Sequence, residues 1–232
     1  MKRSLLPILI SAFAIFVAAG PAKAQDIKRL EPEMSDYIAL LNAAGYEVFN
    51  FDISSLKDDT YSISFVIHEY NNGELVSDKS PLVSLPNRSM IAEFPEEYQK
   101  EIISEGTAYD LQNGIYKLGK KISIGFYNKV DSLRHMMISL VGIASFNDIG
   151  LPLKPMVIND EDNRRGYLYS IRPFKTDSIA IGDITPLVCV ASFYYDKDNI
   201  LRFCTENEFT LTSKTLRKIP HYYVIGIKVY KH

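Results

Sequence analysis

The stretch TYSISFVIHEYNNGELVSD, from Thr60 to Asp78, decides the fold class of this chain. Its first half alternates with a period of two, as a half-buried strand does, and one face carries Tyr61, Ile63, Phe65 and Ile67. The residues Asn71-Asn72-Gly73 follow, and Asn and Gly tolerate the positive φ that a tight hairpin needs. A second run, Glu74 to Ser77, then returns beside the first. The stretch therefore predicts a β-hairpin that serves strand pairing.

His68 is the one residue of this hairpin that could take part in chemistry. It lies on the polar side of the predicted strand, and no second metal ligand or catalytic partner is close to it in the sequence. We therefore expect His68 to be solvated or held by structural hydrogen bonds.

Similar runs lie on both sides of the hairpin. Residues 46–54 (YEVFNFDIS) and 120–128 (KKISIGFYN) alternate in the same way. Residues 130–142 (VDSLRHMMISLVG) fit either a helix or a strand paired with 120–128, and we favour the strand. After residue 166, short runs separated by turn signals continue to the end of the printed sequence. Such spacing is typical of a β-sandwich or barrel.

Two short helices are also expected. Ser35 can cap a helix over residues 36–44, which Gly45 would end, and Pro95 can open a second one that includes residues 96–103. The sequence thus predicts a mainly β protein, an antiparallel β-sandwich with a short N-terminal helix. An α+β fold is the alternative.

Residues 147–166 are rich in Pro, Gly and charge and have little apolar periodicity, so we expect a linker there. It would separate an N-terminal helix and first β-rich module, 25–146, from a second β-rich module, 167–232. The hairpin-like runs 61–78 and 186–203 resemble each other, and each is later followed by a strand that contains Gly. Two related modules would explain this, and so would convergent hairpin patterns.

The N-terminus, MKRSLLPILISAFAIFVAAGPAKAQD, has the order of a secretory signal peptide: positive charge, an apolar run, and a small-x-small cleavage site. The apolar run of about 15 residues is shorter than the roughly 20 that span a bilayer. We expect residues 1–24 to be removed, which predicts an exported protein of the periplasm, the cell surface or the medium. No transmembrane segment is expected after cleavage.

The charge of the exported chain argues against nucleic acid as a partner. Residues 1–24 hold three of the 26 basic residues and none of the 28 acidic ones, so 23 basic residues remain against 28 acidic ones. Phosphate backbones attract basic patches. A glycan or a protein partner in the cell envelope fits better.

The two cysteines, Cys189 and Cys204, are candidates for a disulfide, because exported proteins often carry them. They lie on the two arms of an expected hairpin around residues 196–199. With Tyr195 opposite Ile200 the two would be diagonal neighbours, and a bulge or a shift in register would bring them face to face. Two buried thiols are the alternative.

No catalytic, cofactor or metal residues are predicted. Ser54 to Lys57 matches the Ser-x-x-Lys of penicillin-binding enzymes, but the other motifs of those enzymes are missing. The acidic run at 159–163 lacks the spacing and the Gly of a helix–loop–helix calcium site. We expect no cofactor, and we lean towards a protein that is not an enzyme.

The last run, HYYVIGIKVYKH, offers one candidate surface. Tyr223, Ile225, Ile227 and Val229 form an apolar face that we assign to the core. The opposite face carries Tyr222, Lys228 and Tyr230, whose rings and charge could contact a sugar or a partner chain. Tyrosines that merely cover neighbouring residues on the outer face of a strand are the alternative.

With its signal peptide and its HEYNNGELV hairpin, the chain resembles exported bacterial proteins that are known only as domains of unknown function, many of them built from β-sandwich modules. The resemblance implies location and fold class and assigns no catalytic residue. We expect a β-rich binding or envelope-associated protein. A periplasmic or secreted hydrolase acting on envelope or nutrient polymers is the alternative.

Overall fold

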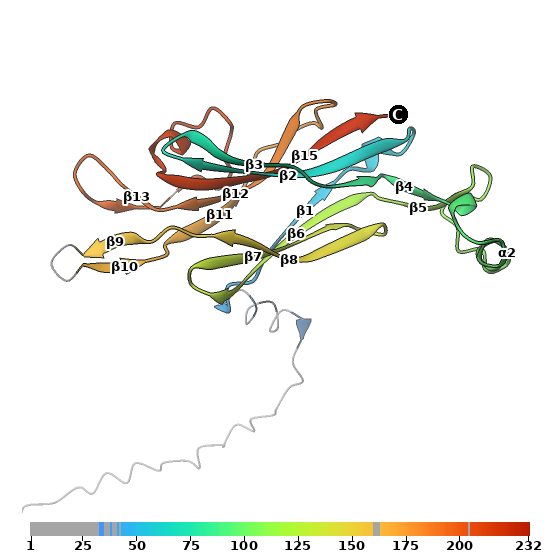
Figure 1. Ribbon diagram of the computed structural model, residues 1–232, viewed down its shortest axis with the longest axis horizontal. Coiled ribbons are helices and arrows are strands. Elements are labelled where there is room, and N and C mark those ends of the chain that lie inside the picture. Colours follow the sequence, from blue (N-terminus) through green and yellow to red (C-terminus); the bar gives the residue numbers. More distant parts are fainter. Residues whose placement is uncertain (1–32, 35–37, 39–40, 42, 160–162, 204) are drawn as a thin grey trace, which may run out of the picture.

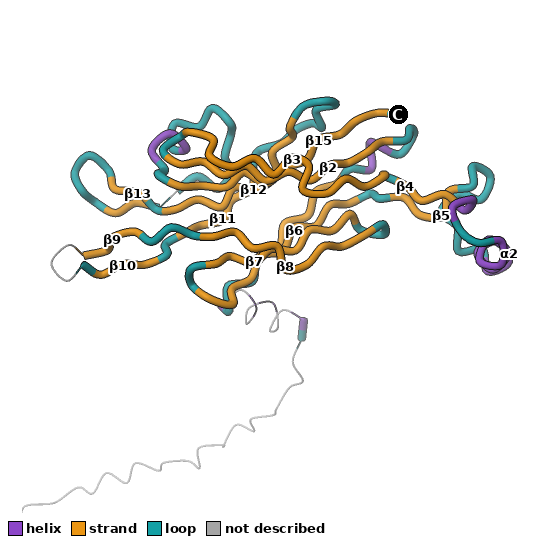
Figure 2. The backbone as a smooth tube through the Cα atoms, in the orientation of Figure 1, coloured by secondary structure: helices purple, strands orange, loops and turns teal. Residues whose placement is uncertain are grey.

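The computed structural model describes residues 33–34, 38, 41, 43–159, 163–203 and 205–232. Within this part, two antiparallel sheets lie one above the other (Figures 1 and 2), and shorter hairpins extend from their margins. The mainly β, antiparallel fold expected from the sequence is confirmed.

The larger sheet has five strands and the smaller has four. In spatial order, the five-stranded sheet consists of β11 (Tyr169–Pro173), β12 (Ile184–Ser192), β15 (His221–Lys231), β2 (Tyr61–Asn71) and β3 (Glu74–Pro86). The four-stranded sheet consists of β1 (Glu47–Asp52), β6 (Lys121–Val130), β7 (Leu133–Leu140) and β8 (Ala144–Pro152).

The described part also contains three two-stranded ladders, the helix α2 and three 3₁₀ turns, besides helical residues before β1. The ladders are β4 (Arg88–Met90) with β5 (Ile115–Leu118), β9 (Met156–Asn159) with β10 (Arg164–Gly166), and β13 (Tyr194–Tyr195) with β14 (Leu201–Arg202). The helix α2 spans Glu96–Glu105, and the 3₁₀ turns are η1 (Ser54–Leu56), η2 (Ile91–Glu93) and η3 (Leu216–Lys218).

The hairpin predicted from Thr60 to Asp78 is present as β2 and the first part of β3. Asn71 pairs with Glu74 across the turn, and the turn residues Asn72 and Gly73 have φ values of 49° and 83°. Two successive positive φ angles twist the turn in the sense that suits the twist of the strands. The returning strand is longer than expected and continues to Pro86.

The core lies between the two sheets. It joins Ile63, Phe65 and Ile67 of β2 to the alternate apolar residues of β6, β7, β12 and β15. The inner face assigned to the last strand is confirmed, because this cluster includes Tyr223, Ile225, Ile227 and Val229. Burial of such large side chains stabilises the fold by about 1.5–3 kcal/mol each.

The ambiguous run at 130–142 forms strand β7, which pairs with β6 as we favoured. The second expected helix is also confirmed as α2, with acidic residues in its first turn and Gly106 in the left-handed conformation at its end. The expected helix over 36–44 lies largely outside the described residues.

The segment 147–166, expected as a linker, contains most of β8, all of β9 and all of β10. The five-stranded sheet also joins residues from both sides of it, because β2 and β3 pair in one sheet with β11, β12 and β15. Backbone hydrogen bonds between β2 and β15 extend over the full length of both strands and connect the two expected modules.

A second, smaller core covers part of the outer face of the five-stranded sheet. Phe209, Leu216 and Ile219, from the segment that precedes β15, pack onto Tyr222 and Val224. The other end of the same face, around Lys228, is not covered by this segment, and it carries the candidate site described next.

Candidate functional site

Two cross-strand rows form the floor of a groove on the outer face of the five-stranded sheet. In the first row, Lys228 of β15 lies opposite Ser64 of β2, which lies opposite Ser84 of β3. In the second, Tyr230 lies opposite Ser62. Alternate residues of a strand share a face. The rows therefore place a cation, a ring and several hydroxyls on one surface.

A bulge in β3 builds one wall of the groove. Phe65 pairs with Val83 and Ile67 with Lys79, so residues 80–82 of β3 stand against Val66 alone. Extra residues of this kind bend a strand locally and change the direction in which its side chains point. Ser80 and Pro81, within this bulge, line the groove.

The groove has a volume of about 360 Å³. It is lined by Ser62, Ser64, Val66, Ser80, Pro81, Ser84, Lys228, Tyr230 and His232. We refer to it as the Lys228–Tyr230 groove. The hydroxyls of Ser64 and Ser84 lie 2.7 Å apart and form a hydrogen bond.

Two polar groups of the groove make no polar contact with the described residues. The Oγ atom of Ser80 is buried and has no hydrogen-bond partner among them. Lys228 forms no ion pair with the described carboxylates, and none of the lining residues is acidic. A buried hydroxyl without a partner costs free energy, roughly 1–3 kcal/mol.

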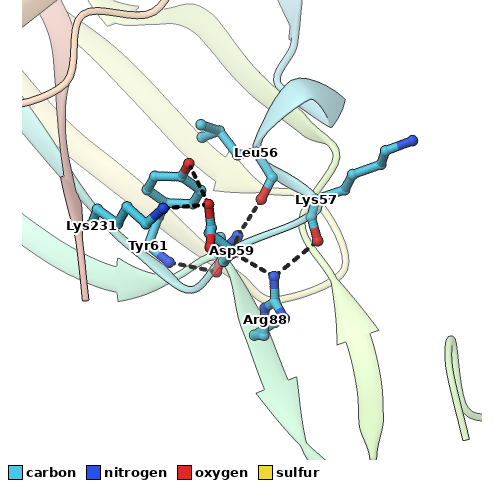
Figure 3. A network of polar contacts seen from close by, with 7 residues as sticks. Leu56, Lys57, Asp59, Tyr61, Arg88 and Lys231 are labelled. Carbon is cyan, nitrogen blue, oxygen red and sulfur yellow. Dashed lines mark hydrogen bonds and ion pairs between the residues drawn. The ribbon is translucent and has the colours of Figure 1, made fainter. Parts of the chain in front are cut away.

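A network of polar contacts fixes the strand ends beside the groove (Figure 3). Lys231 Nζ lies 2.6 Å from Asp59 Oδ2, and the Tyr61 hydroxyl donates to the same atom at 3.5 Å. The hydrogen bond from Lys231 lowers the pKa of Asp59. Arg88 donates to the backbone carbonyls of Lys57 and Asp59. These contacts hold the loop before β2 against the end of β15 that carries Tyr230.

The structure separates the three residues that the sequence proposed for ligand contact. Lys228 and Tyr230 line the groove, and Tyr230 is 43% exposed. Tyr222 lies eight residues earlier on β15, about 26 Å away along an extended strand. It is 8% exposed, lies under the segment that precedes β15, and stacks on Tyr70 with 4.7 Å between ring centroids. Its burial raises its pKa to about 12.

Sequence reasoning did not find the serines of the groove. Ser62 and Ser64 lie on the face of the predicted strand opposite Ile63 and Phe65, where nothing in the sequence marks them as ligand contacts. Ser80 and Ser84 lie beyond the predicted hairpin, in a stretch without clear periodicity. Their contribution depends on the register of β3 and on its bulge, which local periodicity does not encode. The alternation of Ser with apolar residues in SISF was the available signal.

The cysteine pair is only partly described. Cys189 is buried within β12, and Cys204 lies outside the described residues. The expected hairpin is present as β13 and β14, but Tyr195 pairs with Leu201, one residue further along than Ile200. The disulfide stays a prediction.

A buried chain of hydrogen bonds links Glu69, His221 and Tyr169 at the other end of β15. His221 Nε2 lies 3.1 Å from Glu69 Oε1, and His221 Nδ1 lies 2.5 Å from the Tyr169 hydroxyl. A carboxylate only accepts, so Nε2 carries the proton and Nδ1 accepts from Tyr169. Burial lowers the pKa of His221 and raises that of Tyr169 to about 12.

The Glu69–His221–Tyr169 chain contains the residue types of a catalytic relay, but a substrate cannot reach its histidine. His221 is 2% exposed, and none of the three residues lines the Lys228–Tyr230 groove. A catalytic base must reach a proton of the substrate. The chain therefore connects β2, β11 and β15 and stabilises that end of the sheet.

The other two described pairs of histidine and carboxylate also join neighbouring strands. His68 Nε2 lies 3.1 Å from Asp78 Oδ1 of β3, although the geometry is that of an ion pair rather than an aligned hydrogen bond. His135 Nδ1 lies 2.5 Å from Asp148 Oδ1 of β8. His68 is thus buried beside Asp78 and is neither solvated nor satisfied by a hydrogen bond at Nε2 from the described residues, so neither expected outcome is met.

Among the residues that the structure describes, no group of three or more His, Cys, Asp and Glu side chains gathers as a metal site would require. The described helices include none that is long and apolar enough to cross a membrane. The acidic run at 159–163 falls mainly on residues outside the described part.

Together, the fold and the groove define a β-sandwich protein with an open polar groove on the outer face of one sheet. The chain belongs to the family described as "Domain of unknown function (DUF5041)", whose model matches residues 16–231. No curated protein and no solved structure matches the chain.

Proposed function

We propose that this is an exported binding protein whose Lys228–Tyr230 groove takes a segment of an anionic glycan. The single observation that carries the proposal is the arrangement of Lys228 and Tyr230 with several serines around one groove that has no acidic lining residue. The hydroxyls of Ser62, Ser64 and Ser84 line the same surface.

The chemistry of the groove favours an acidic sugar over an apolar ligand. Serine hydroxyls donate and accept hydrogen bonds and so match the hydroxyls of a sugar. The face of the Tyr230 ring can pack on the apolar face of a pyranose. Lys228 provides a positive charge in a groove without acidic lining residues, which favours a carboxylate or phosphate substituent.

Isothermal titration calorimetry with tetragalacturonic acid, and with neutral maltotetraose for comparison, tests the proposal. We expect the acidic sugar to bind more tightly. Lys228→Met should weaken its binding about tenfold, since the loss of one charged hydrogen bond costs about 1.5 kcal/mol. Tyr230→Ala should weaken it about fivefold.

Matched controls lie outside the groove. Lys121 is an exposed lysine on β6, and Tyr98 is 51% exposed on α2. Lys121→Met and Tyr98→Ala should leave the affinity unchanged. Equal weakening by the control variants, or no binding of the acidic sugar at millimolar concentration, would contradict the proposal.

Export is the second part of the proposal. The signal-like sequence at residues 1–24 supports it. We expect the protein isolated from the producing cell to begin at Gln25, and mass spectrometry of its N-terminal peptide measures this. An intact Met1 on a membrane-retained protein would contradict it.

A further inference from the structure

The edges of the two main sheets differ in how they are protected against further strand pairing. Exposed edges pair with other chains, and proteins commonly block them with prolines, bulges or inward-pointing charges. Edge strand β3 has two register shifts and contains Pro81 and Pro86, and edge strand β8 has a register shift and ends at Pro152.

Edge strand β11 is short, ends at Pro173, and is continued by a backbone pairing. Lys175 donates to the Phe209 carbonyl, and Phe209 donates to the Pro173 carbonyl, each through its backbone N–H. Strand β1 has neither a proline nor a bulge, and its one charge on the half-buried face of Phe49 and Phe51 is Glu47, at its first residue. Its sequence EVFNFD contains no proline, glycine or lysine, and its register with β6 is regular throughout.

The ladder with β6 determines which backbone groups of β1 stay open. The N–H of Ile53 donates to the carbonyl of Lys120 at 2.9 Å, one step beyond Asp52 and Lys121, the last pair of β1 with β6. Hydrogen-bonded pairs alternate in an antiparallel ladder. The N–H and C=O groups of Val48, Asn50 and Asp52 therefore point away from β6, and within the described part they make no backbone hydrogen bond to another segment.

Two grooves lie along this open edge, with volumes of about 470 and 360 Å³. They share Asn50, Phe51, Thr176 and Asp177, so they are continuous. Consecutive residues, 48–53, line one side, and consecutive residues, 173–179, line the other. Neighbouring residues of a strand point to opposite faces of the sheet. A groove on one face would therefore contact every second residue, whereas this one contacts every residue from 48 to 53 and so runs along the edge of β1. We call this the β1-edge groove.

The charge of the β1-edge groove indicates the chemistry of its occupant. Asp52, Asp177 and Glu208 line it, against the single cation Lys175. A basic segment complements this lining. A second copy of this chain does not, because pairing β1 with its own copy would bring two acidic grooves together.

We propose that β1 accepts an additional antiparallel or parallel strand, supplied by a basic, extended segment of a partner polypeptide. Six residues of β1 span about 20 Å, so the segment that pairs has about six residues. Its backbone bonds the open groups of Val48, Asn50 and Asp52, and its lysine or arginine side chains face the acidic wall. Strand addition of this kind gives affinity through the main chain and specificity through alternate side chains.

The β1-edge groove shares no lining residue with the Lys228–Tyr230 groove, so this inference does not depend on glycan binding. The probe is an eight-residue peptide that alternates valine with lysine and threonine, acetylated and amidated at its ends. Hydrogen exchange, followed residue by residue by NMR, measures binding. With 1 mM peptide, the amides of Val48, Asn50 and Asp52 should exchange at least about tenfold more slowly.

A fully N-methylated peptide, which keeps the side chains but cannot donate from its backbone, should give no protection. On the protein, Asn50→Pro removes one open N–H without touching the β6 ladder, as an edge position permits. We expect it to weaken binding at least about tenfold. Asn50→Ala keeps the N–H and is the matched control, with binding retained within about twofold.

Asp177→Lys reverses a charge on the opposite wall and leaves the backbone of β1 intact, so it keeps the test decisive if Asn50→Pro does not fold. It should weaken the basic peptide and reduce the salt dependence of binding. Lys228→Met should change nothing. No protection of the three amides at 1 mM peptide, equal binding of the N-methylated peptide, or protection caused by dimerisation of the protein alone would overturn the proposal.

Discussion

The side chain of Asn87 fixes the first residue of β2, because its Oδ1 accepts the backbone N–H of Tyr61 at 3.0 Å. Its Nδ2 donates to the carbonyls of Leu56 and Asp59, at 2.8 and 3.0 Å. Asn87 itself is fully buried. One amide thus satisfies three backbone groups of a loop that would otherwise need solvent.

Asn87→Ala should therefore destabilise the fold strongly. It removes the side-chain partner of the Tyr61 N–H and of the Leu56 carbonyl, and we expect the free energy of unfolding to fall by about 3 kcal/mol. Urea denaturation measures this. Asn113→Ala is the control, because Asn113 is exposed and bonds only to nearby Asp110. Equal midpoints for the two variants would contradict the role of Asn87.

Stability should fall on acidification through His221. Burial lowers its pKa, an effect that the hydrogen bond to Glu69 opposes. The unfolded chain therefore binds the proton more readily than the folded one, and the free energy of unfolding decreases as the pH falls below the ordinary histidine value of about 6.5.

His221→Gln should flatten this dependence between pH 7 and pH 5, measured as urea midpoints at each pH. His232→Gln, at an exposed histidine, is the control and should keep the slope of the parent. Parallel curves for the parent and His221→Gln would show that His221 does not carry the effect.

Gly226 should tolerate no side chain. A Cβ at this position would lie 2.6 Å from the backbone carbonyl oxygen of Thr185, where β12 approaches β15 closely. Since backbone must move, Gly226→Ala should lower the free energy of unfolding by about 2 kcal/mol or more. At Gly125 of β6 a Cβ would meet only side-chain atoms, of Met137 at 3.5 Å and of Val48 at 4.0 Å, which are ordinary contacts. Gly125→Ala should change thermal stability little, and a similar loss in both variants would refute this account.

Cys189 and Cys204 should form a disulfide, because the proposed export would place them in an oxidising compartment. A bridge that closes a loop of about 15 residues stabilises by roughly 3 kcal/mol in the chain-entropy model. Thiol titration of the denatured, unreduced protein should find no free thiol, and reduction should lower the melting temperature. Two titrated thiols before reduction would rule the bridge out.

Local periodicity explains what the sequence could predict. The β2–β3 hairpin, strand β7 and the inner face of β15 each follow from alternation within about ten residues. The position of the turn between β2 and β3 was predictable from residue type, because Asn72 and Gly73 take the positive φ values that Asn and Gly favour.

The candidate site was less predictable because it depends on contacts between distant segments. Lys228 and Tyr230 were found from one strand, but Ser80 reaches them only through a bulge in β3. Tyr222 lies on the same face of β15 as Lys228 and Tyr230, but the segment containing Phe209 and Leu216 covers it. That segment has no periodic pattern from which its position could be inferred. The open edge of β1 likewise follows from strand order, which no local pattern contains.

The central position of β15 has a consequence for how the chain folds. This strand follows every other strand in the sequence, yet it lies between β12 and β2, and its Ile225 pairs with Ile67, 158 positions earlier. Pairing at such separation has a high contact order and closes slowly. During synthesis, β2 and β3 emerge long before their partner does. The five-stranded sheet therefore becomes complete only after translation has passed residue 231, and until then β2 lacks one of its two neighbouring strands and remains available to chaperones.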